Sequence, residues 1–110
     1  MPIPSFDLKV VQSDRTTRIA PSGELDIATT PEFEQAIAEA TTQPGAKLVL
    51  DLRELTFMDS TGLRALAQTN ARADEAGFAL SIVRGPLQIE RVLEISGLAR
   101  LLPLVDAPTG

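Results

Sequence analysis

The stretch "KLVLDLRELTFMDSTGLRAL", residues 47–66, decides the fold, because its hydrophobic pattern changes from that of a strand to that of a helix. Its first part, "KLVLDL", is a continuous apolar run, typical of strands inside parallel sheets or of sheets covered by helices on both faces. After Ser60 a helical face is predicted, and Gly77 is well placed to end the helix. The apolar residues on this face are Leu63, Leu66, Ala67 and Ala71. A strand that leads into a helix indicates an α/β fold.

The segments on either side predict further strands. Residues 5–11 alternate apolar and polar side chains, which is typical of an edge strand with one solvated face. Residues 16–26 predict a second strand, interrupted by a proline and a glycine, that can pair with the first as a hairpin. Residues 78–83 predict another strand, and residues 101–105 predict a last, short one.

Two more helices follow from the same kind of spacing. The first is expected to have Thr30 as its N-cap and Pro31 at its first helical position. Its buried face is predicted to contain Phe33, Ala36, Ile37 and Ala40. The other helix is expected to begin at Pro86 and to end at Gly97.

The resulting order of elements is β-β-α-β-α-β-α, with a possible final strand. Strands that alternate with helices predict parallel pairing through right-handed crossovers. We therefore expect an α/β fold, a mixed sheet of four to five strands with about three helices. A chain of 110 residues suits one compact domain over residues 1–110, in which residues 106–110 form a loose tail.

Composition excludes several classes of function. The 10 Lys and Arg residues against 15 Asp and Glu give a formal net charge of −5, which disfavours nucleic acid and anionic membranes and favours protein partners. Thiolate zinc sites and the commonest general base are missing, because the chain has no cysteine and no histidine. We expect no cofactor and no metal. No apolar run approaches the roughly 20 residues of a membrane helix, and a cytoplasmic protein is expected.

The segment "FMDSTGL", residues 57–63, places two hydroxyl groups at the carboxyl end of a strand, where α/β proteins usually have their functional sites. Ser60 can serve as a helix N-cap, which is worth about 1 kcal/mol, or as a site of modification. A nucleophilic role lacks a base, because there is no histidine and no spacing connects Ser60 with Lys9 or Lys47, the two lysines.

Other ligand sites have weaker support. Asp26 and Asp59 can in principle bind a hard cation, but acidic residues are abundant here and solvated turns explain both carboxylates. The glycine motifs of P-loop and dinucleotide-binding proteins are absent. These observations disfavour an enzyme.

Three segments in one order cover nearly the whole chain and carry a family pattern. They are "SGELDIATTPEF" (residues 22–33), "LDLRELTFMDSTGLRAL" (residues 50–66) and "RVLEISGLARLLPL" (residues 91–104). Together they resemble the STAS domain family, and in particular bacterial anti-sigma factor antagonists. In that family a G-E-L-D segment precedes the first helix, D-S-[ST]-G-L follows the central strand, and S-G-L ends the last helix.

The resemblance implies a set of site residues. Ser60 matches the hydroxyl that is phosphorylated in this family by a serine kinase, which is also the anti-sigma factor. Thr61 is a possible secondary acceptor or a bystander. Asp26 matches a position associated with contact to the kinase, Asp59 is the acidic neighbour of the acceptor, and Gly62 completes the expected partner-binding set.

The function implied is that of an anti-sigma factor antagonist without enzymatic activity. Its unphosphorylated form would bind the anti-sigma factor kinase and release a sigma factor. Phosphorylation at Ser60 would end this binding, and a phosphatase would restore it. The alternative within the family is a STAS subunit of a larger assembly, such as a signalling scaffold or a lipid-transport complex. A nucleotide-binding regulatory domain is the weaker alternative, because the chain has no phosphate loop.

Overall fold

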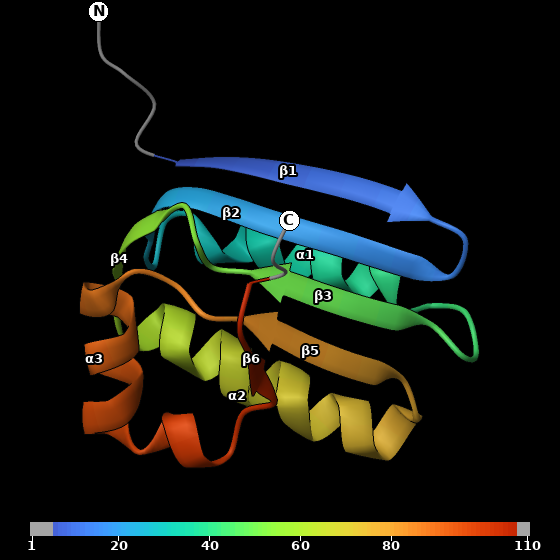
Figure 1. The fold of residues 1–110 in the computed structure, drawn as a ribbon. Helices are drawn as coiled ribbons and strands as arrows, with labels where there is room; N and C mark the ends of the chain where they lie inside the picture. Colours follow the sequence, from blue (N-terminus) through green and yellow to red (C-terminus); the bar gives the residue numbers. More distant parts are fainter. Residues whose placement is uncertain (1–5, 108–110) are drawn as a thin grey trace, which may run out of the picture.

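The computed structural model describes residues 6–107 as a single layered unit (Figure 1). The last residues of the predicted tail, 108–110, lie outside the described residues. In chain order the elements are β1 (Phe6–Ser13), β2 (Thr16–Leu25), α1 (Thr30–Ala40), β3 (Lys47–Asp51), β4 (Leu55–Met58), α2 (Ser60–Ala76), β5 (Ala79–Val83), α3 (Leu87–Ser96), the 3-10 helix η1 (Leu98–Arg100) and β6 (Leu104–Val105).

The sheet confirms the predicted mixed α/β fold. Its strands follow the order β1-β2-β3-β5-β6, and β1 is the predicted antiparallel edge strand while the other pairs are parallel. The structure adds β4, which the sequence did not separate from the preceding apolar run. Residues 16–19 of β2 pair with β3, whereas residues 23–25 pair with β4. One long strand therefore has two shorter neighbours in succession.

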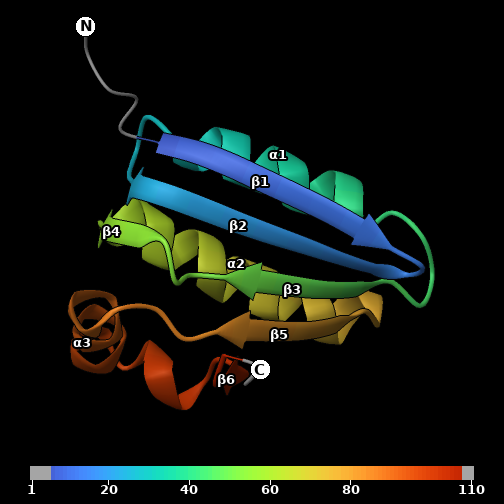
Figure 2. The ribbon, with the colours of Figure 1, turned by 45° about the horizontal axis from the view of Figure 1, so that its top comes forward.

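Helices α1 and α2 lie behind the same face of the sheet, so that the other face of β1, β2 and β3 remains open (Figure 2). Residues from strands and helices meet in one buried cluster between these layers, among them Ile19, Leu50, Ile82, Phe33, Ile37 and Leu66. Phe33 and Ile37 confirm the predicted inner face of α1. In α2 the prediction that Ala71 belongs to the buried face is wrong, because Ala71 is exposed. The face of the helix that contains Gly62 packs against the sheet, and its buried residues are Gly62, Ala65, Leu66, Thr69 and Ala73.

The helix ends confirm some predictions and correct one. Gly77 and Gly97 end α2 and α3 with φ values of 78° and 85°, the left-handed conformation that favours glycine. The prediction of Thr30 as N-cap of α1, with Pro31 as its first helical residue, is wrong by one residue, because Thr29 occupies the cap position and Thr30 is already helical. The hydroxyl of Thr29 instead accepts a hydrogen bond from the N–H of Asp26 at 2.9 Å and donates one to the carbonyl of Glu24 at 2.8 Å.

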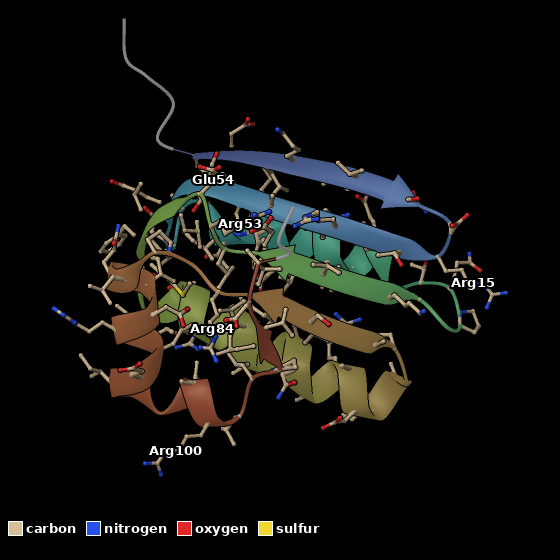
Figure 3. All side chains as sticks on the ribbon, in the orientation of Figure 1. Arg15, Arg53, Glu54, Arg84 and Arg100 are labelled. Carbon is tan, nitrogen blue, oxygen red and sulfur yellow. The ribbon has the colours of Figure 1, made fainter. Side chains whose placement is uncertain are left out.

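A charged cluster on the open face marks the point where the chain passes from β3 towards β4. The buried carboxylate of Asp51 ends β3, and its Oδ2 accepts from the guanidinium groups of Arg18 at 3.0 Å and Arg53 at 2.7 Å. Arg53 lies over the sheet in Figure 3. Burial alone would raise the pKa of Asp51, but the hydrogen bonds from Arg53 and Arg18 outweigh it and lower that pKa to about 2.

This cluster predicts an acid-sensitive part of the folding stability. The pKa of Asp51 is depressed on folding, so its contribution of about 2 kcal/mol is present above about pH 4 and is lost as the pH falls towards 2. In an Asp51→Asn variant this loss should be absent from urea unfolding curves recorded across that pH range. The exposed Asp74→Asn variant is the control and should follow the wild type. Identical pH profiles for Asp51→Asn and wild type would contradict this role.

Candidate functional site

The predicted site residues lie at one end of the sheet. The carboxyl ends of β2 and β4 and the start of α3 lie at the left in Figure 1, while the hairpin tip with Arg15 lies at the opposite end in Figure 3. The N–H of Asp59 donates to the carbonyl of Leu25 at 3.2 Å, and Asp26 directly follows Leu25. The structure thus brings the G-E-L-D segment and the D-S-T-G segment together.

The first turn of α2 is capped by Asp59. Its Oδ1 accepts from the N–H of Thr61 at 2.9 Å and of Gly62 at 3.2 Å, and its own backbone is extended. Ser60 is therefore not the N-cap, and that possibility raised by the sequence is wrong. Aspartate and serine cap equally well, so two such residues in succession left the choice open until the backbone conformation was known.

Ser60 itself is the exposed first residue of α2. No hydrogen bond joins its hydroxyl to another residue within the described part of the chain, so the fold does not use this group. Thr61 is partly buried, and Arg64 is exposed four residues further along the helix, on the same side as Ser60. Of the two adjacent hydroxyls, that of Ser60 belongs to the more exposed residue.

Asp26 forms a turn, which is one of the roles that the sequence left open for it. Its Oδ1 accepts from the N–H groups of Ala28 at 3.0 Å and Thr29 at 3.1 Å, and its carbonyl accepts from the N–H of Thr30 at 2.8 Å. These bonds form the turn that leads from β2 into α1. The G-E-L-D aspartate therefore holds the loop next to Ser60 in place.

Gly62 is required by close packing. A Cβ at this position would lie 2.7 Å from Cγ of Met58 and 3.1 Å from Cδ2 of Leu25, both of which are buried. Glycine therefore allows α2 to approach the ends of β2 and β4 more closely than any other residue would. This contact places Asp59 and Ser60 at the sheet end.

Large apolar side chains are exposed at the same end, which the strand and helix patterns did not predict. Ile27, in the segment after β2, is 76% exposed, Leu87 at the start of α3 is 71% exposed, and Phe57 in β4 is 48% exposed. Contiguous exposed apolar surface often marks a protein interface. A signal for this surface was present in the sequence, because Ile27 is a large apolar residue that directly follows "GELD" and belongs to neither the predicted strand nor the predicted helix.

Within residues 6–107 the geometry supports neither a cation site nor a serine–lysine pair. Within them no group of three acidic residues is arranged to hold a metal ion. Lys9 lies on the edge strand β1, and Lys47 lies at the start of β3, at the end of the sheet away from Ser60. No helix in this range is long and apolar enough to cross a membrane.

Comparisons with known proteins agree with this geometry. A family model described as "Mlab, STAS domain" matches residues 8–105. The chain belongs to the STAS domain family. The anti-sigma-B factor antagonist of Staphylococcus aureus is 26% identical over 98 residues, which cover 89% of this chain and 91% of that protein.

Solved structures extend the comparison. An anti-sigma factor antagonist from Mycobacterium paratuberculosis is 30% identical, with a TM-score of 0.80 over 94% of this STAS chain and 87% of that one. SpoIIAA of Bacillus in its phosphorylated form shares the fold, with a TM-score of 0.73 and 21% identity over 93% of this chain and 92% of that one. The predicted membership among anti-sigma factor antagonists is confirmed.

The packing at Gly62 predicts an unusual sign for a helical substitution. In an unhindered helix Gly→Ala stabilises by about 0.5–1 kcal/mol. Here the added methyl group would collide with Met58, so Gly62→Ala should lower the free energy of unfolding by about 1–3 kcal/mol in urea unfolding. A double-mutant cycle with Met58→Ala should show a smaller loss for Gly62→Ala once space is available. A stabilised Gly62→Ala variant would contradict the close approach.

The cap assignment predicts different stabilities for neighbouring variants. Asp59→Ala should cost about 1 kcal/mol, because the N–H groups of Thr61 and Gly62 lose their acceptor. Ser60→Ala should change the free energy of unfolding by less than about 0.5 kcal/mol, because its hydroxyl has no partner within the described residues. Asp59→Asn, which keeps an oxygen at Oδ1, is the matched control. Equal losses for the two alanine variants in thermal unfolding would show that the cap is shared.

Proposed function

We propose that this STAS protein is a cytoplasmic partner switch, which binds an anti-sigma factor kinase when Ser60 is unmodified and releases it after phosphorylation of Ser60. The observation that carries the proposal is the exposed hydroxyl of Ser60, which the fold does not use and which adjoins the loop formed by Asp26. The capping role that would otherwise explain this position belongs to Asp59.

The proposed partner surface combines the switch with apolar anchors. It includes Asp26, Asp59, Ser60 and Thr61, and Gly62 of the predicted set is buried beneath them, where it supports the surface through packing. The exposed Ile27, Phe57 and Leu87 at the same end of the sheet would supply the apolar area that most protein interfaces need at their centre. The neutral hydroxyl of Ser60 can be desolvated in such an interface at modest cost, whereas a phosphate cannot.

The proposed modification is a transfer of the γ-phosphoryl group of ATP. The Ser60 Oγ forms a bond to phosphorus and loses its proton to a base of the kinase, the bond to the leaving ADP breaks, and the kinase binds the nucleotide and its metal. The product carries about −1.5 to −2 additional charges. Asp59 already occupies the N–H groups of Thr61 and Gly62, so the phosphate would add to the negative charge of Asp59 instead of replacing its hydrogen bonds.

This arrangement would separate binding from folding. Because the Ser60 hydroxyl makes no bond that the described fold needs, phosphorylation can leave the domain intact while two adjacent negative groups repel the partner. A change from nearly complete to nearly absent binding requires a difference of roughly 5.5 kcal/mol between the two forms. Burial of an unpaired phosphate against an apolar surface can supply a difference of this size. A phosphatase would reset the switch.

The central test uses the kinase captured from host lysate by the unmodified protein. With ATP it should add one phosphate at Ser60, detected by intact mass and site mapping. Ser60→Ala should gain no phosphate there and keep its affinity in calorimetry, because no charge is added. Ser60→Glu should bind at least tenfold more weakly, a loss of about 1.4 kcal/mol.

Controls separate the roles of neighbouring groups in that assay. Ser96→Ala, a change at another exposed serine, should behave as the wild type in phosphorylation and binding. Thr61→Ala tests for a secondary acceptor. Asp26→Asn keeps the Oδ1 acceptor of the loop and removes only the charge, so weaker binding by this variant would place its carboxylate in the interface. Phosphate at another residue, with Ser60→Glu still binding fully, would overturn the proposed switch.

A second candidate is a STAS subunit of a larger assembly, such as a lipid-transport complex. The description "Mlab, STAS domain" of the matching family model favours it. The same end of the sheet would then contact a stable partner. Capture of a membrane-associated complex, with no kinase and no dependence on phosphorylation, would select this alternative.

A further inference from the structure

The long edge strand β1 is a surface that the proposed switch does not use. β1 has 8 residues, whereas the opposite edge strand β6 has 2. Among the described residues only β2 pairs with β1, along its whole length. A regular, exposed edge of this length is a template for pairing with another strand.

The hairpin geometry determines which backbone groups of β1 face outward. Ser13 and Thr16 are partners on either side of a two-residue turn, so they form a hydrogen-bonded pair. The register then continues without a shift to the pair of Phe6 and Gly23. Alternation along the strand therefore directs the N–H and C=O groups of one set of residues to the free edge: Phe6, Leu8, Val10 and Gln12.

We propose that a second copy of this chain pairs antiparallel along β1, with a two-fold axis at Leu8, to form a dimer with one continuous sheet. This inference goes beyond the partner switch and does not depend on it. Closed two-fold symmetry requires the strands to run in opposite directions. In this register Leu8 lies opposite the partner subunit's Leu8, and Phe6 lies opposite the partner subunit's Val10.

Charge favours this register over those with the axis at either neighbouring residue. With the axis at Leu8, Asp7 lies opposite the partner subunit's Lys9, and symmetry repeats the pair. An axis at Lys9 would place the two lysines opposite each other, and an axis at Asp7 would do the same with the two aspartates. Opposite charges at facing positions of neighbouring strands stabilise, and like charges destabilise, by about 0.2–1 kcal/mol each.

Both faces of β1 fit such a partner. Asp7 and Lys9 line the open-face groove of about 450 Å³ that also contains Asp51, so their charges meet on the solvated side. Phe6 and Leu8 pack against the core on the helix side. Val10 is 51% exposed in the single chain and would be covered by the partner subunit's Phe6.

The proposed dimer leaves the Ser60 site accessible. β4 lies on the side of β2 away from β1, and α2 follows β4 directly (Figures 1 and 2). Because the two β1 strands run in opposite directions, the two Ser60 ends would point away from each other. Each subunit could bind its own partner, and Ser60→Glu should not change dimerisation.

A charge-swap series tests the register by sedimentation equilibrium from micromolar to millimolar protein. The wild type should show a monomer–dimer equilibrium. Lys9→Asp alone and Asp7→Lys alone should each raise the dimer dissociation constant about tenfold or more, because each change creates two repulsive pairs. The double variant Asp7→Lys/Lys9→Asp should restore the wild-type constant within about threefold by re-forming both pairs. A wild type that stays monomeric, or a double variant that is no better than the single ones, would overturn the proposal.

Proline substitutions provide an independent test of the backbone edge. The N–H of Val10 faces outward, so Val10→Pro should abolish the dimer while circular dichroism and thermal unfolding show an intact domain. The matched Val11→Pro change removes an N–H that bonds to β2, and should lower the stability of the monomer. A folded Val10→Pro variant that dimerises like the wild type would overturn pairing through β1, whatever the outcome for Ser60 phosphorylation.

Discussion

The close approach of α2 to the ends of β2 and β4 is the contact on which the rest of the structure depends. Gly62 allows it, because any side chain at this position would overlap Met58 and press on Leu25. The N–H of Asp59 bonds to the carbonyl of Leu25, and its carboxylate caps the helix that begins one residue later. One small residue thereby places Ser60 at the end of the sheet, beside the loop that Asp26 organises.

The segment between β3 and α2 is held at both ends by β2. At one end Arg18 of β2 bonds to Asp51, which also holds Arg53. At the other end Leu25 of β2 accepts the hydrogen bond from Asp59, and β4 pairs with β2 in between. Two fixed points on a single strand therefore define the position of the switch segment, and a charged cluster far from Ser60 contributes to its placement.

The proposed functions use groups that the described fold does not need. The Ser60 hydroxyl has no bonding partner within residues 6–107, and the outward backbone groups of β1 have no strand beside them in this range. Modification or pairing at such groups can change binding without loss of the internal hydrogen bonds. The two surfaces lie on different sides of β2, so a switch at one of them can operate while the other is occupied.

The sequence by itself determined the order of elements, the edge position of β1, the glycine ends of α2 and α3, and the family, because hydrophobic period and short motifs are local properties of the chain. Only the tertiary structure decided that Asp59 and not Ser60 caps α2, that the Asp26 carboxylate accepts from the N–H groups of Ala28 and Thr29, that Ala71 faces solvent and that β4 is a separate strand. It also brought Arg18 to Asp51 across 33 residues of sequence. Some of these features depend on contacts between segments that lie far apart in the chain. Others depend on a choice between neighbouring residues with equal propensities. The hydrophobic periodicity of the sequence contains no information about either.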